Sequence, residues 1–274
     1  MLVDLFNLGE QVAVVTGGYG VLGGAIAEGL VGAGASVALL GRNREAAEER
    51  AAELRQRSLA GAKVTVLTAD VTDERSLRRA CDDLLHEFDR IDILINAAGG
   101  NVARARNDDR PIFDLPLDAF DEVVSLNLHG TVYPSLVFGE AMAKQGKGCI
   151  VNISSMASVQ AISGVLGYSV AKAAIDNFTR WMAVDLARRF GDGLRVNAIA
   201  PGFFITKQNR DVLLNADGSY TQRSQAVIGR TPMGRFGDPS ELVGTAVWLC
   251  SDASAFVTGA VIPVDGGFSA FSGV

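Results

Sequence analysis

The stretch TGGYGVLG, Thr16 to Gly23, decides the fold of this chain. It follows the short apolar run Val12–Thr16 and opens a helix-like run from Gly23 to Gly34. Glycines between a strand and a helix let the backbone approach a pyrophosphate, and the helix N-terminus favours negative charge. The stretch therefore predicts a dinucleotide-binding loop at the start of an α/β fold.

Two glycine patterns compete within this loop. A G-x-G-x-x-G pattern runs from Gly18 through Gly20 to Gly23. A second pattern, T-G-x-x-x-G-x-G, uses Gly17 and Gly23, with Val21 where its middle glycine belongs. The loop residues alone leave the choice between the two registers open.

Short apolar runs alternate with longer amphipathic runs along the rest of the chain. Apolar strands separated by helices are typical of a parallel sheet covered on both faces. Right-handed crossovers then give a doubly wound Rossmann fold, for which we expect seven parallel strands. We expect a single domain over residues 1–274, with polar insertions at about 100–116 and 202–230 that follow strand ends, where such sheets bind ligands. The further strand candidates are 36–40, 63–70, 91–99, 148–155, 194–202 and 259–267.

Composition excludes several classes of function. A net charge of −6 over 274 residues gives no electrostatic support for nucleic-acid binding. The first ten residues do not resemble a signal peptide, and no run approaches the ~20 apolar residues of a membrane helix. Cys81, Cys149 and Cys250 are far apart and odd in number, which favours reduced thiols and a cytoplasmic location. With two histidines and no cysteine pair, we expect no metal site.

The end of the second strand bears on which dinucleotide binds. An NAD fingerprint places an acidic residue about 20 residues after the loop, but Gly41 occupies that position and Arg42 follows it. A guanidinium can pair with a 2′-phosphate, so NADP is favoured over NAD, with a merely solvated arginine as the alternative. Asp70, which ends the third strand, is placed either to accept from the adenine amino group or to cap the next helix.

The stretch GYSVAKAA places Tyr168 and Lys172 four residues apart. On a helix this spacing puts both side chains on one face. A phenol ionises near pH ~10, and a neighbouring ammonium lowers its pKa. The pair can then exchange a proton with a substrate oxygen. The motif alone is weak, but Ser155, at the end of a buried strand, and Asn127 belong to a wider constellation.

With these motifs, and with INAAG at 95–99 and PGFFIT at 201–206, the chain resembles the short-chain dehydrogenase/reductase family nearly end to end. The resemblance implies an NAD(P)-dependent oxidoreductase in which Tyr168 is the general acid/base. Lys172 would be its electrostatic partner and would also hold the nicotinamide ribose. Ser155 would polarise the substrate oxygen, and Asn127 would hold a water that links Lys172 to solvent.

The resemblance also implies the cofactor-binding residues and the register of the loop. In the family register Gly17 and Gly23 shape the loop, and we expect Gly20 to supply the backbone freedom that Val21 lacks. Thr206 would contact the nicotinamide carboxamide. The expected set for NADP or NAD is Gly17, Gly20, Val21, Leu22, Gly23, Arg42, Asn43, Asp70, Val71, Asn96, Ala97, Ala98, Gly99, Tyr168, Lys172, Pro201, Gly202, Phe204 and Thr206.

The two polar insertions point to the substrate class. Their arginine, lysine and asparagine side chains suit a polyhydroxylated acid, because cations bind carboxylates and amides bind hydroxyls. We expect Asn101, Ser155 and Arg210 to contact it. TPMGRFG and IPVDGGFSAFSGV resemble the sugar-acid branch of the family, which includes D-mannonate oxidoreductases (fructuronate reductases) and gluconate 5-dehydrogenases. A non-catalytic dinucleotide-binding regulator is the alternative from another class.

The resemblance further implies a homotetramer that pairs long helices near 117–143 and 168–189. The apolar tail at 266–274 carries Phe268 and Phe271. We expect these rings to be buried, either against a neighbouring subunit or against other residues of the same chain.

Overall fold

The computed structural model describes residues 3–58, 61–108, 110–207 and 209–273. Its strands form one parallel sheet of seven strands in the order β3-β2-β1-β4-β5-β6-β7, which confirms the predicted fold class. The strands are β1 (Val12–Thr16), β2 (Ser36–Gly41), β3 (Val64–Thr68), β4 (Ile93–Asn96), β5 (Gly148–Ile153), β6 (Leu194–Pro201) and β7 (Val261–Val264). The helices are α1 (Val21–Gly32), α2 (Arg44–Arg55), α3 (Glu74–Phe88), α4 (Leu117–Val124), α5 (Gly130–Gln145), α6 (Leu166–Phe190), α7 (Arg210–Leu213), α8 (Gln222–Arg230) and α9 (Val243–Cys250).

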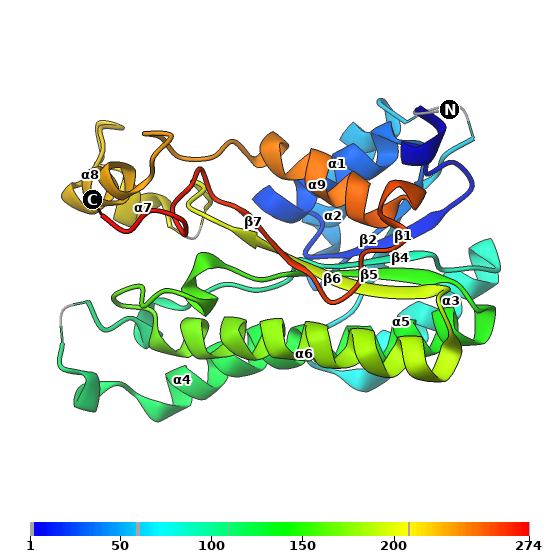
Figure 1. The fold of residues 1–274 in the computed structure, drawn as a ribbon, viewed down its shortest axis with the longest axis horizontal. Coiled ribbons are helices and arrows are strands. Elements are labelled where there is room, and N and C mark those ends of the chain that lie inside the picture. The colour runs from blue at the N-terminus through cyan, green and yellow to red at the C-terminus, as the bar shows by residue number, and fades with distance from the viewer. Residues whose placement is uncertain (1–2, 59–60, 109, 208, 274) are drawn as a thin grey trace.

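Helices cover both faces of the sheet (Figure 1). Helices α1, α2 and α9 lie on one face, and α3, α4, α5 and α6 lie on the other. Successive strand residues point to opposite faces, so Val15 joins a core with α1 and α9 while Val14 joins a core with α3, α5 and α6. The sheet is therefore buried on both sides, which explains why its strands lack polar alternation.

The strand order reverses between β1 and β4, and ligands bind at such a switch point. Thr16 and Asn96 are register partners at the carboxyl ends of these strands. The Thr16 hydroxyl accepts hydrogen bonds from the backbone N–H groups of Ala97 (3.1 Å) and Ala98 (3.0 Å). Thr16 thus ties the chain leaving β4 to the start of the glycine loop.

The two predicted insertions follow β4 and β6 at this same end of the sheet. The segment after β4 contains two short 3-10 turns, Ala103–Ala105 and Ile112–Asp114. The segment after β6 contains α7 and α8, and the C-terminal segment lies beside them (Figure 1). The strand ends and both insertions therefore surround one region of the molecule.

The helical stretch expected near 117–143 contains an irregularity. A π-helical turn, Ser125–His129, separates α4 from α5. The stretch expected near 168–189 is the single helix α6, 25 residues long. Within the described ranges, none of the helices has the length and apolar character needed to cross a membrane.

The C-terminal tail packs on its own subunit. The rings of Phe268 and Phe203 meet edge to face, with centroids 5.1 Å apart, and the backbone N–H of Ser269 donates to Asp265 Oδ2. Phe271 remains 36% exposed. Of the two locations expected for the tail, the structure shows contact with the chain itself for Phe268.

Candidate active site

A cavity of about 600 Å³ opens at the carboxyl ends of the strands. The glycine loop, the ends of β4, β5 and β6, the start of α6 and both insertions contribute to its wall. It brings together residues that the sequence analysis predicted separately. These are Gly17, Gly20, Val21, Leu22, Gly23, Asn43, Ala97, Gly99, Asn101, Ser155, Tyr168, Lys172, Pro201, Gly202, Phe204 and Thr206.

Gly17, Gly18 and Gly23, rather than Gly20, are the confined positions of the loop. Gly17 has φ +64°, a conformation that favours glycine. A Cβ on Gly23 would lie 2.5 Å from the Gly17 carbonyl oxygen. Gly20 instead has φ −76°, which any residue adopts, so the expectation that it supplies special backbone freedom is not supported. Gly17 is a fixed glycine only in the T-G-x-x-x-G-x-G register, and its positive φ agrees with that register.

This loop fits the pyrophosphate of a nicotinamide dinucleotide. The missing side chains at Gly17 and Gly23 keep backbone at the cavity wall, and the loop leads directly into α1, which begins at Val21. The first turn of α1 carries no acidic residue, so its N-terminal dipole is not neutralised there. The accessible loop backbone and the positive potential of the helix N-terminus therefore lie together, which is the arrangement that binds a pyrophosphate.

Several predicted cofactor residues lie behind the described cavity wall. Asn96 is 1% exposed, and its Nδ2 donates to Ser135 Oγ (2.8 Å) and Asn152 Oδ1 (2.9 Å). Val71 is buried against Gly130. Ala98 is held by Thr16, as described above. These side chains support the strand ends.

Arg42 and Asp70 lie outside the described lining as well. Their side chains are 3.8 Å apart, and that of Arg42 is 73% exposed. Asp70 Oδ1 accepts hydrogen bonds from the N–H (2.9 Å) and hydroxyl (2.7 Å) of Thr72. The cap of α3 is Asp73, which accepts from Arg75 N–H, so the helix-capping alternative for Asp70 is wrong.

Asn127 anchors the beginning of the first insertion. It lies in the π-helical turn and is fully buried. Its Oδ1 accepts from the N–H of Gly100 (3.0 Å), and its Nδ2 donates to the carbonyls of Gly100 (2.7 Å) and Val123 (2.8 Å). The side chain that was expected to hold a water is therefore engaged with protein backbone.

Tyr168 and Lys172 lie together at the start of α6, as their spacing predicts. Lys172 is 4% exposed, its ammonium lies 5.3 Å from the centre of the Tyr168 ring, and it donates to the Ile153 carbonyl at 2.7 Å. Ser155 follows β5, and its Oγ accepts from the N–H of Ala157 (3.1 Å). Helix α6 begins at Leu166, so Tyr168 lies in its first turn, where negative charge is stabilised.

The pKa values of this pair are set mainly by burial. Burial raises the pKa of the Tyr168 phenol, and a hydrogen bond with Ser155 opposes the rise. Burial lowers the pKa of Lys172 to about 8, and the carboxylate of Asp176 opposes this change. The sequence predicted a lowered pKa for Tyr168, and that direction is wrong, because spacing shows the neighbouring ammonium but not the depth of burial.

The predicted substrate residues differ in position. Asn101 lines the cavity, and its buried Nδ2 meets no hydrogen-bond partner in the described part of the chain. Arg210 is exposed at the start of α7 and is not among the described lining residues, whereas its neighbour Asn209 is. Arg106, Lys207 and Asn209, which belong to the polar insertions singled out in the sequence, also line the cavity. Sequence reasoning missed four further lining residues: Tyr19, Asp108, Phe203 and Arg223. Tyr19 could have been inferred from its place in the glycine loop, but no local signal points to Arg223.

Comparisons with known proteins agree with this geometry. A family model described as enoyl-(acyl carrier protein) reductase matches residues 20–269. UxuB, an uncharacterized oxidoreductase of Bacillus subtilis, is 46% identical over 278 residues, which cover 98% of each protein. The crystal structure of a proposed D-mannonate oxidoreductase from Haemophilus influenzae with bound NAD has a TM-score of 0.91 and 39% identity, over 100% of both chains.

A third comparison concerns a solved sugar-acid enzyme. The gluconate 5-dehydrogenase of Burkholderia cenocepacia, in complex with NADP and tartrate, has a TM-score of 0.88 and 32% identity, over 99% of this chain and 100% of that chain. These three relatives each match 98% or more of this chain. The chain is therefore an NAD(P)-dependent oxidoreductase that belongs to the short-chain dehydrogenase/reductase family.

Proposed function

We propose that this oxidoreductase interconverts a hydroxyl and a ketone on a sugar acid, with D-mannonate and D-fructuronate as its substrate pair. The observation that carries the proposal is one cavity holding Ser155, Tyr168 and Lys172 together with cationic and amide side chains from both insertions. Such side chains match carboxylate and hydroxyl groups. The likeness to the Haemophilus influenzae protein supports the same substrate pair.

In the proposed mechanism Tyr168 exchanges a proton with the substrate oxygen. A bound dinucleotide supplies or accepts the hydride at its nicotinamide ring. The raised pKa of Tyr168 keeps the phenol protonated, so it can donate to the oxygen of a ketone during reduction. Ser155 positions that oxygen, and the ammonium of Lys172 stabilises negative charge on the phenol.

A second candidate is the oxidation of gluconate at C5. It is favoured by the likeness to the gluconate 5-dehydrogenase of Burkholderia cenocepacia and uses the same catalytic residues. A purely regulatory role has no such support, because Ser155, Tyr168 and Lys172 all line one cavity.

We propose a preference for NADP over NAD. Gly41 stands where an NAD fingerprint places its acidic residue, and a Cβ at Gly41 would lie 2.2 Å from Cε1 of Tyr19. The Tyr19 hydroxyl accepts from the N–H of Asn43 at 3.3 Å. The phenol ring thus takes the room of an acidic side chain, and Arg42 remains available beside it for a 2′-phosphate.

A matrix of substrates and cofactors tests the proposed function. Mannonate, gluconate, altronate, tagaturonate and fructuronate are each assayed with NAD(H) and NADP(H) by nicotinamide absorbance. We expect the highest kcat/KM for the mannonate–fructuronate pair, and a Tyr168→Phe variant to lose about 100-fold or more in kcat, the general acid–base contribution. Turnover confined to alcohols without a carboxylate would contradict the proposal.

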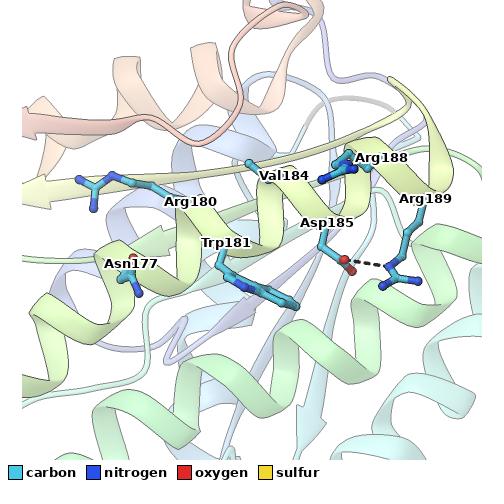
Figure 2. Close-up of a pocket in the computed structure, with 7 residues that line it drawn as sticks. All are labelled: Asn177, Arg180, Trp181, Val184, Asp185, Arg188 and Arg189. Atoms are coloured by element: carbon cyan, nitrogen blue, oxygen red, sulfur yellow. Dashed lines mark hydrogen bonds and ion pairs between the residues drawn. The ribbon is translucent and has the colours of Figure 1, made fainter.

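We also propose a cytoplasmic homotetramer. All three cysteines are free and buried. Figure 2 shows a cavity on α6 beside which Trp181 and Val184 project, and these side chains are 66% and 58% exposed. Leu136 on α5 is 57% exposed. An apolar face of this kind is better buried against a second copy of the chain, as the family resemblance implies.

A further inference from the structure

The two insertions are tied together at the cavity wall by one aspartate between two arginines. Arg106 Nε donates to Asp108 Oδ2 at 2.7 Å, and its Nη2 donates to the same oxygen. Arg223, on α8, donates through Nη1 to Asp108 Oδ1 at 3.1 Å and through Nη2 to the Ser163 carbonyl at 2.9 Å. All three charged residues line the cavity that contains Tyr168.

The charges of this cluster do not balance. Among the residues that the structure describes here, two guanidinium groups face one carboxylate, which leaves one net positive charge, although the whole chain carries −6. The side chains of Arg106, Asp108 and Arg223 are only 37%, 28% and 29% exposed. Charges that are partly withdrawn from water interact more strongly than surface charges, so this cluster attracts anions.

The geometry already accommodates a carboxylate. Asp108 presents one oxygen to each arginine, so the two guanidinium groups converge on a single planar anion. A guanidinium carries five N–H donors, more than Asp108 takes from either side chain. Asn101 adds an amide donor in the same cavity, and its buried Nδ2 has no hydrogen-bond partner among the described residues.

Arg104 differs from Arg106 and Arg223 in its partners and in its exposure. It lies in the same insertion but pairs with Asp118 (2.7 Å) and Glu122 (3.1 Å) on α4, with 59% of its side chain exposed. It is absent from the described lining of the cavity. Its carboxylate partners outnumber it, so Arg104 offers no excess positive charge.

We infer that Arg106 and Arg223 bind the carboxylate of the substrate, and that Asp108 occupies this anion site until the substrate arrives. The inference rests on the proposed sugar-acid function and names the residues that select an acid over a neutral sugar. Selection follows because a neutral polyol leaves the guanidinium groups without a new partner.

Binding to a protein that cannot turn over tests the inference directly. In a Tyr168→Phe background saturated with NADP⁺, binding of D-mannonate and D-gluconate is measured by calorimetry for Arg106→Met, Arg223→Met, Asp108→Asn and Arg104→Met. We expect the first two changes each to weaken binding by about 10- to 100-fold, the range for hydrogen bonds to charged groups. Arg104→Met should leave the affinity unchanged.

The Asp108 variant separates a binding role from a merely structural one. Asp108→Asn removes the internal competitor and retains the side-chain volume, so the affinity for both acids should hold or rise. If the cluster only braces the insertions, Asp108→Asn should weaken binding as much as the arginine variants do. That result would overturn the inference, as would unchanged affinity in Arg106→Met and Arg223→Met or preferential binding of inorganic phosphate.

The outcomes also distinguish the two proposals. If the wild-type protein turns over no sugar acid, yet the Tyr168→Phe protein binds gluconate through Arg106 and Arg223, the proposed function fails and the carboxylate site stands. If the wild-type protein turns over mannonate and both arginine variants retain its KM, the carboxylate site fails and the proposed function stands.

Discussion

Gly23 leaves no room for a side chain. A methyl group there would lie 2.5 Å from the Gly17 carbonyl oxygen, a backbone atom that moves only with the whole loop, whereas at Gly20 the corresponding distance is 3.1 Å. We expect Gly23→Ala to cost about 1–3 kcal/mol of stability, as overpacking does, and to weaken dinucleotide binding. Gly20→Ala should do much less of both. Thermal unfolding and fluorescence titration measure the two effects, and equal losses in both variants would contradict this account.

Arg42 is the residue on which the proposed preference for NADP depends. We expect Arg42→Ala to weaken NADPH binding by about tenfold or more, the range for a charge-assisted hydrogen bond, and to leave NADH binding unchanged. Arg44→Ala is the matched control, because Arg44 is exposed nearby and pairs with Glu48. Fluorescence titration with both dinucleotides checks the prediction, and an equal loss for NADH would show that Arg42 does not read the 2′-phosphate.

Residue identities could be predicted better than residue environments. Tyr168 and Lys172 could be located because helical spacing alone puts them on one face. The direction of the Tyr168 pKa could not, because burial raises that pKa by more than the hydrogen bond with Ser155 lowers it. The role expected of Gly20 is not supported for a similar reason, because the φ angle at Gly20 is set by the fold of the loop and cannot be read from the loop sequence.

Helix α6 carries a buried carboxylate, Asp176, besides Tyr168 and Lys172. Asp176 lies one turn beyond Lys172, is 4% exposed, and accepts a hydrogen bond from Ser154. Its carboxylate raises the pKa of Lys172 against the effect of burial. Asp176 is thus a positioning residue that helps to keep Lys172 charged.

Removing this carboxylate should change the pH profile of carbonyl reduction. The pKa of Lys172 is about 8, so its charge is lost as pH rises through that value. In Asp176→Asn the pKa falls further, and the alkaline limb of kcat/KM should move to lower pH. Asp82→Asn, an exposed change on α3, should leave the limb in place. A limb that does not move in Asp176→Asn would contradict the assignment.

Secondary structure was predictable where periodicity is strong. The seven strands lie where continuous apolar runs occur, because burial on both faces removes polar positions. The π-helical turn at Ser125–His129 was not predictable, since its residues continue a helical pattern. Within this turn, Asn127 accepts a hydrogen bond from Gly100, which is distant in sequence.

Helix α6 presents exposed apolar side chains, Trp181 and Val184, on the surface of the whole molecule. Trp181 on α6 is the largest exposed side chain beside the cavity of Figure 2. We expect Trp181→Glu to lower the mass measured by light scattering at least twofold, because a buried charge opposes association, and Trp181→Phe to retain the parent mass. An unchanged mass for Trp181→Glu would exclude this face from the assembly.

Distant parts of the chain meet only in the complete fold. Arg223 and Asp108 are 115 positions apart in sequence, and their ion pair requires β4, β6 and both insertions to be in place. The sequence indicated that cationic insertions border the cavity, but it pointed to Arg210 instead of Arg223. Which arginine faces inward depends on how α7 and α8 pack, and no local pattern encodes that packing.

The π-helical turn between α4 and α5 makes the chain sensitive to its own length. A π turn accommodates one residue more than an α turn, so deletion of one residue within 125–129 would leave a regular, uninterrupted helix. The same deletion would rotate the preceding residues by about 100° about the helix axis and carry the Asn127 amide away from Gly100. A regular helix could therefore replace this turn only if the hydrogen bonds between Asn127 and Gly100 at the cavity wall were lost. We expect the irregularity to persist wherever turnover is under selection.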